Sequence, residues 1–217
     1  MGLLVKTALA DQIIDILRDR IVAGDIPADL PIRQDALAAE LGVSKIPLRE
    51  AFAKLEQDGL VVSQTNRGYF VSPLSTEEAL DVFDLRLKIE PEAVGAAAAR
   101  LLPDDITRAR RALAELNEAT VSASPKAGAL NRAYHMALIR PCRRPVTILT
   151  IERIQVIAER YAVKHLEPKG RPARASAEHR ALLEAWSAGD ARRAAALSAD
   201  HIAATLDDLG RELRMTR

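Results

Sequence analysis

Residues 37–71 read LAAELGVSKIPLREAFAKLEQDGLVVSQTNRGYFV, and this stretch decides the fold of the chain. Within it, Leu48, Phe52 and Leu55 follow one another at intervals of four and three residues. This spacing places apolar side chains on one face of a helix. We therefore expect a helix over about residues 44–58 whose apolar face is buried.

Gly42 and Ser44 separate this helix from a shorter one that precedes it. Glycine often ends a helix, and the side-chain oxygen of Ser44 can accept a hydrogen bond from a free N–H group of the next one, so Ser44 is the expected N-cap. After the second helix, β-rich runs at residues 61–64 and 69–72 are joined by residues 65–68, which predicts a hairpin. Helix, tight turn, helix and hairpin together predict a winged helix-turn-helix.

Hydrogen-bond donors gather at two edges of this predicted module. Lys45 and Arg49 lie four residues apart and off the apolar face, beside a helix N-terminus whose free N–H groups attract phosphate. At the hairpin tip, Gly68 permits a positive φ and a close approach to DNA. The alternative is an ordinary helical hairpin with a solvated, charged face. The predicted DNA-binding residues are Ser44, Lys45, Ile46, Arg49, Asn66, Arg67 and Gly68.

Residues 37–51, 55–61 and 67–71 closely resemble the winged-helix domain of GntR-family transcriptional regulators. This resemblance implies a DNA-binding regulator and not an enzyme. The chain departs from the family at Gln34, where an acidic residue is usual, and at Lys45, where an arginine is common. Because lysine lacks the planar fork with which arginine pairs with guanine, the resemblance predicts DNA binding but does not predict the operator sequence.

The composition predicts a mainly helical protein with two domains. The chain has 217 residues, of which 48% are hydrophobic and only 3% aromatic, and the strand signal is confined to the hairpin. We expect a mainly α fold, with a winged helix-turn-helix over residues 1–74 and an all-α antiparallel bundle of about six helices over residues 75–217.

The charge balance excludes a general attraction to polyanions, since the formal net charge of the whole chain is only +1. Residues 1–74 carry eight Lys and Arg against ten Asp and Glu, a formal charge of −2. DNA binding must therefore use a local cationic patch. We expect a homodimer, which doubles that patch, on a short palindromic operator in double-stranded DNA.

The single cysteine, Cys142, excludes a disulfide framework within one chain and fits a reducing compartment. The chain has no secretory segment after Met1 and no apolar run of about 18 residues. We therefore expect a cytoplasmic protein without a membrane span.

Outside the deciding stretch, helical spacing predicts the remaining elements. Ile13, Leu17 and Ile21 predict a first helix that begins near Thr7, after an irregular tail at residues 1–6. The second domain is predicted to place helices at residues 76–101, 103–120, 126–140, 146–165, 173–187 and 190–214. The core side of the first of these is expected to carry Val82, Leu85, Ile89 and Ala93.

Three of the four histidines, His135, His179 and His201, fall on three different predicted helices of the second domain. Asn131 lies four residues before His135 and so shares its helical face. If these imidazoles converge, they form a nitrogen-rich site suited to Zn²⁺ or another transition metal. A lone histidine in an alanine-rich helix is more often a surface or core residue, and no spacing rule predicts convergence.

A second resemblance covers this part of the chain, to the FCD effector domain of the FadR-type branch of the GntR family. The residues that carry it are 131–135, 178–183, 188–190 and 200–201, together with Arg86 and Glu90. In many such domains one Asp and three His bind a metal, which helps to hold a carboxylate effector. The resemblance therefore implies a small carboxylate effector beside a divalent transition metal, foremost Zn²⁺, at Asn131, His135, His179 and His201.

Asn131 stands where the family has an aspartate, and a neutral amide oxygen is a weaker ligand, so metal affinity should fall. Arg86 and Arg160 are the predicted effector-binding residues, because a guanidinium offers a bidentate fork to a carboxylate. The alternative for Arg86 is an exposed pair with Glu90, four residues later.

These features predict a ligand-responsive transcriptional regulator, with repression as the commoner behaviour of the family. Effector binding is expected to change the spacing of two recognition helices and hence the affinity for DNA. One alternative is a metal-dependent hydrolase that uses the three histidines. It lacks a general base, since Glu178 is next in sequence to His179 and is expected to point elsewhere. The other alternative is a sensor of the metal itself.

Overall fold

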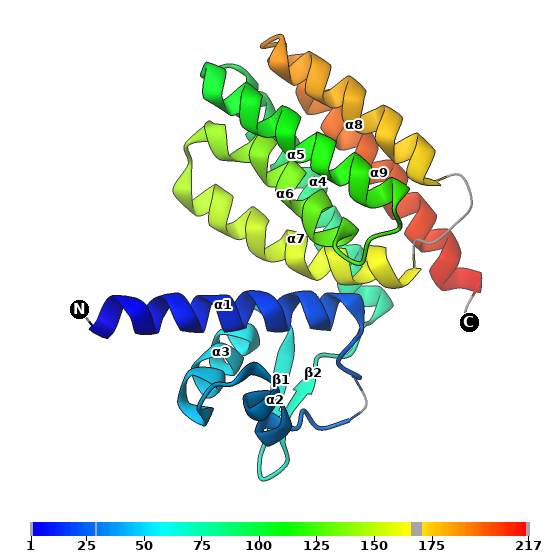
Figure 1. Cartoon of the computed structure of the whole chain (residues 1–217). Coiled ribbons are helices and arrows are strands. Elements are labelled where there is room, and N and C mark those ends of the chain that lie inside the picture. Colours follow the sequence, from blue (N-terminus) through cyan, green and yellow to red (C-terminus); the bar gives the residue numbers. More distant parts are fainter. Residues whose placement is uncertain (1, 29, 166–170, 216–217) are drawn as a thin grey trace. The chain divides into compact units, whose positions relative to one another are not determined.

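The computed structural model describes residues 2–28, 30–165 and 171–215. The chain divides into two compact units, Met1–Leu74 and Ser75–Arg217, here called unit 1 and unit 2 (Figure 1). Unit 1 combines helices with a small hairpin, and the described part of unit 2 is helical. The expected fold class, a winged helix-turn-helix followed by an all-α bundle, is confirmed. No helix in the described part of the chain has the length and apolar character needed to cross a membrane.

The elements of unit 1 are α1 (Gly2–Ala23), α2 (Gln34–Leu41), α3 (Lys45–Gln57), β1 (Val61–Gln64) and β2 (Gly68–Val71). Helix α1 begins at Gly2, so the expectation of an irregular tail over residues 1–6 was wrong for its described part. Leucine and lysine are good helix formers, and neither proline nor a second glycine interrupts residues 3–7. The helix therefore extends toward the N-terminus.

Helices α1 and α3 form the core of unit 1. Leu17 of α1 is fully buried, as are Leu48, Phe52 and Leu55 of α3, which confirms the helical spacing seen in the sequence. At the end of α3, Gly59 has a φ of 80° and directs the chain into the hairpin.

The hairpin is a two-stranded antiparallel sheet in which Val61 pairs with Val71 and Gln64 with Gly68. Gly68 has the positive φ that the sequence predicts, 88°. The ring of Tyr69 stacks on that of Phe52, with 5.0 Å between centroids. This contact fixes the hairpin against α3.

The elements of unit 2 are α4 (Thr76–Ala98), α5 (Pro103–Val121), α6 (Ala127–Ile139), the 3₁₀ turn η1 (Arg140–Cys142), α7 (Pro145–His165), α8 (Arg171–Ser187) and α9 (Ala191–Met215). Helix α4 is the central element, because it packs along α9 and also contacts α6, α7 and α8 (Figure 1). The fully buried rings of Tyr134 and Trp186 lie in the core of this bundle.

One expected core position of α4 was wrong, because Leu85 is 37% exposed whereas Val82 and Ala93 are buried. The buried face of α4 includes the charged residues Arg86 and Glu90, and this orientation turns Leu85 toward solvent. A search for apolar residues alone therefore misplaces the inner face of this helix.

Helices α4 and α9 approach closely at Gly95. A Cβ atom at this position would lie 2.9 Å from the backbone oxygen of Ala191 and 3.3 Å from the Cβ of Ala195. The first distance is too short for a carbon–oxygen contact, so the two backbones can approach this closely only if residue 95 has no side chain.

Replacement of Gly95 by alanine is expected to lower the free energy of unfolding by about 1–2 kcal/mol. Overpacking against α9 costs roughly 1–3 kcal/mol, and the better helix propensity of alanine recovers up to about 1 kcal/mol. Urea denaturation followed by circular dichroism measures the difference. A more stable variant, which helix propensity alone predicts, would contradict the close approach of α4 and α9.

Candidate metal centre and nucleic-acid interface

Three buried histidines from three helices come together in unit 2. His135 lies on α6, His179 on α8 and His201 on α9, and one potential ligand atom of each lies within 4.8 Å of the others. The Nε2 atoms of His179 and His201 are 3.3 Å apart. The bundle thus brings together three side chains whose convergence no spacing rule could predict.

The surroundings of the cluster favour the neutral form of two of its imidazoles, those of His135 and His179. Burial, followed by the charge of the nearby His201, lowers the pKa of His179 to about 3. Burial also lowers the pKa of His135 well below its ordinary value. A neutral imidazole carries a nitrogen lone pair, which is the form that binds a metal.

One buried atom of the cluster, Nε2 of His135, has no hydrogen-bond partner among the described residues. A buried polar atom without a partner is costly. Three converging imidazoles with such an atom among them fit Zn²⁺ or a similar transition metal, which prefers nitrogen ligands.

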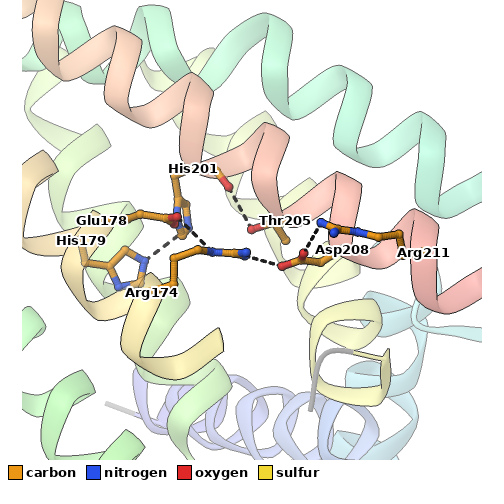
Figure 2. A network of polar contacts seen from close by, with 7 residues as sticks. All are labelled: Arg174, Glu178, His179, His201, Thr205, Asp208 and Arg211. Carbon is orange, nitrogen blue, oxygen red and sulfur yellow. Dashed lines mark hydrogen bonds and ion pairs between the residues drawn. The ribbon is translucent and has the colours of Figure 1, made fainter. Parts of the chain in front are cut away.

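Glu178 reaches this cluster, and the expectation that it points elsewhere was wrong. Its Oε2 atom lies 2.7 Å from Nδ1 of His201 (Figure 2). Adjacent residues on a helix point about 100° apart, so Glu178 and His179 do leave α8 in different directions. Glu178 still makes the contact because His201 comes from α9, which packs against α8.

The histidines line a cavity of about 240 Å³, slightly below the usual range for drug-sized ligands, so it suits a small molecule. Asn131 lines the same cavity, one helical turn before His135. The other polar and charged residues of the wall are Arg86, Asn117, Thr120, Arg132, Gln155, Glu159, Ser176 and Thr205.

Arg86 stands in the cavity wall and is already paired with Glu90. Its Nε atom donates to Oε1 of Glu90 at 2.6 Å, and Nε2 of Gln155 donates to Oε2 of the same carboxylate at 3.1 Å. The ion pair between Arg86 and Glu90 is the one expected from residues four apart on a helix, but both side chains are buried rather than exposed.

A second arginine, Arg132, lines the cavity and was missed by sequence reasoning. Its Nε atom lies 3.4 Å from Oε2 of Glu159 on α7. The sequence feature that could have indicated Arg132 is its position between Asn131 and His135. It was overlooked because Arg132 does not share their helical face. Each arginine of the cavity wall is thus paired with a buried glutamate.

Arg160 lies elsewhere in unit 2 and is not among the described residues that line the cavity. It is buried near Glu78 at the start of α4, and burial lowers its pKa. The hydroxyl group of the next residue, Tyr161, accepts a hydrogen bond from the backbone N–H of Ser75 at 3.0 Å and donates one to Glu78. This group of residues holds the start of α4 against α7.

In unit 1, the N-terminal edge of α3 is exposed. Ser44 occupies the expected N-cap position with an extended backbone, but its side chain makes no capping hydrogen bond. Ile46 and Arg49 are exposed on the same edge. Lys45 is also exposed, and its Nζ atom lies 2.7 Å from Oδ1 of Asp35 on α2.

The hairpin tip carries the other predicted DNA-binding residues. Asn66 and Arg67 are exposed, and Asn66 has a φ of 62° in the turn. The guanidinium group of Arg67 lies over the ring of Phe70, 5.3 Å from its centroid. Donors are therefore present at both edges of unit 1 that the sequence indicated.

Two family models match the chain. The one described as "Bacterial regulatory proteins, gntR family" matches residues 9–71, and the one described as "FCD domain" matches residues 81–204.

Curated relatives are similar over most of the chain. A protein named as a probable D-xylose utilization operon transcriptional repressor, from Paenarthrobacter nicotinovorans, is 27% identical over 94% of this chain and 89% of its own length. The HTH-type transcriptional repressor GlaR of Escherichia coli K12 is 27% identical over 86% of this chain and 89% of its own. The solved structure of E. coli McbR/YncC matches 94% of this chain and 98% of its own with a TM-score of 0.82 at 20% identity, which shows a shared fold.

Proposed function

Because the chain belongs to the GntR family of bacterial regulatory proteins and carries an FCD domain, we propose that a small ligand bound in unit 2 controls DNA binding by unit 1. The chain is a DNA-binding transcriptional regulator of this family. The family and the named relatives are regulators rather than enzymes, so the hydrolase alternative is not retained.

The observation that carries the proposal for unit 2 is the convergence of His135, His179 and His201 on one cavity wall. These three residues would hold a divalent transition metal, foremost Zn²⁺, and the amide oxygen of Asn131 would be an additional donor. The bound metal would supply a concentrated positive charge to a ligand in the cavity.

Charge balance supports the metal as the receptor for a small carboxylate, which is the effector that the FCD resemblance implies. Arg86 and Arg132 are each paired with a buried glutamate, and Asn131 carries no charge. Because the pKa values of His135 and His179 are lowered, these imidazoles add no positive charge at neutral pH. The side chains of the cavity thus have little net charge to offer an anion, and a bound divalent cation would provide it. We therefore expect a small carboxylate to bind only when the metal is present.

Unit 1 is proposed to bind double-stranded DNA through its two exposed edges. The proposed residues are Ser44, Lys45, Ile46 and Arg49 at the start of α3, with Asn66, Arg67 and Gly68 at the hairpin tip. The formal charge of residues 1–74 is −2, so the electrostatic attraction of a single unit 1 to DNA phosphates is weak. A homodimer on a palindromic operator would double the number of contacts.

Helix α7 offers a route from the cavity to the start of α4. It contributes Gln155 and Glu159 to the cavity wall, and its Tyr161 hydrogen-bonds Ser75, the residue that follows unit 1 in the chain. We propose that ligand binding shifts α7 and thereby the first turn of α4, which alters DNA affinity. Since the two named relatives are repressors, we propose repression that the ligand relieves.

His179→Ala is expected to abolish metal binding, because it removes one of three nitrogen ligands from a site to which the described residues contribute no carboxylate ligand. Elemental analysis of protein purified without chelator should find about one divalent metal ion per chain in the wild type and almost none in the variant. Arg180→Ala, which changes the exposed neighbour on α8, is the matched control and should retain the metal. Equal metal content in all three proteins would contradict the site.

Asn131→Asp is expected to change two affinities in opposite directions. A carboxylate adds a charged ligand, so Zn²⁺ should bind more tightly, on the order of tenfold. The same negative charge should weaken the binding of a small carboxylate such as acetate to the metal-loaded protein. Calorimetric titrations with Zn²⁺ and then with acetate measure both changes. A variant that binds acetate more tightly, or binds it equally without metal, would rule out the metal as the anion receptor.

Arg49→Ala is expected to weaken binding to an operator selected from random DNA by about 1–3 kcal/mol if Arg49 contacts a base. Lys54→Ala is the matched control, since Lys54 lies near the C-terminal end of α3 and pairs with Asp58 at 3.2 Å. Fluorescence anisotropy with labelled operator measures both affinities. If the two variants bind equally well, Arg49 does not read the operator.

A further inference from the structure

A chain of charged side chains continues from the histidine cluster along α8 and α9 (Figure 2). Oε1 of Glu178, the residue that contacts His201, lies 3.2 Å from Nε of Arg174. The Nη2 atom of Arg174 donates to Oδ2 of Asp208 on α9. Asp208 in turn accepts a hydrogen bond from Arg211 at 2.8 Å. Glu178 is thus held by partners from two helices.

The contact with Glu178 determines which nitrogen of His201 carries a proton. A carboxylate accepts hydrogen bonds, so in a ring with a single proton that proton lies on Nδ1 of His201, 2.7 Å from Oε2 of Glu178. The lone pair is then on Nε2. This atom is the one that faces His179, at 3.3 Å between the Nε2 atoms.

His201 differs from the other two histidines in this respect. Within the described part of the chain, it is the one member of the cluster that is paired with a carboxylate. A carboxylate behind a ligating histidine fixes the orientation of the ring and raises its basicity, both of which strengthen metal binding. If Glu178 had only a structural role, its ion pairs would join α8 to α9 but would not affect metal binding by His201.

We propose that Glu178 is a positioning residue of the metal site, and that Arg174, anchored by Asp208, holds Glu178 in place. Glu178 keeps His201 in the tautomer whose Nε2 lone pair faces the cluster. The effect on metal affinity rests on the proposed function, because it requires that the three histidines bind a metal. The effect of Glu178 on the tautomer of His201 is independent of the proposed function, since the tautomer is a property of the metal-free protein.

The first experiment is a competition titration of Zn²⁺ against a chromogenic chelator. Glu178→Ala should lower the affinity for Zn²⁺ by about 10–100-fold, the usual effect of removing such a partner. Glu178→Gln, which keeps the shape but loses the charge, should give an intermediate loss. The matched control is Glu184→Gln, an exposed residue on the same helix, which should bind as the wild type does. Wild-type affinity in both Glu178 variants would overturn the proposal.

The second experiment records the ring nitrogen resonances of His201 in the metal-free protein by long-range ¹H–¹⁵N spectroscopy. The wild type should show a proton on Nδ1, and Glu178→Ala should shift the ring toward the tautomer protonated on Nε2. The same tautomer in both proteins would overturn the positioning role. If the wild type binds no Zn²⁺ but the tautomer shifts as expected, the proposed metal site fails while Glu178 still positions His201.

Discussion

Three buried imidazoles, with one potential ligand atom of each within 4.8 Å of the others, impose the constraint on which unit 2 depends. A ring nitrogen that leaves water must find a partner, or the fold loses stability. Glu178 supplies that partner to His201, while Nε2 of His135 has none among the described residues. The hydroxyl group of Tyr134 donates to the backbone oxygen of His179 at 2.8 Å and so holds α6 against α8 beside the cluster. Such an arrangement costs stability by itself, and a bound cation would offset that cost.

The same constraint explains the charges around the cavity. A bare guanidinium group in the wall would be costly to bury and would repel a cation, whereas Arg86 and Arg132 are each neutralised by a glutamate. The wall would therefore accept a divalent ion without strong repulsion. The ion would then dominate the field that a ligand meets. Asn131 suits this balance, because an aspartate in its place would cancel part of the charge that attracts a carboxylate.

Local patterns predicted the elements, but the site depends on how the elements pack. The spacing of Leu48, Phe52 and Leu55 gave the buried face of α3, since that face depends on neighbours three and four residues away. The convergence of the histidines depends on the packing of α6, α8 and α9, which no local spacing contains. Glu178 was misplaced for the same reason, because its contact lies on another helix. Arg160 was chosen by residue type alone, and it is not among the described residues that line this cavity, so its role in effector binding stays a prediction.

The central claim is that the histidine cluster holds a metal ion. Anomalous X-ray diffraction from crystals of the wild-type protein grown with Zn²⁺ tests it most directly. We expect one strong anomalous peak enclosed by the imidazoles of His135, His179 and His201, about 2.0–2.1 Å from one nitrogen of each ring. Ordered imidazoles with no peak between them, in crystals that contain Zn²⁺ bound elsewhere, would contradict the account.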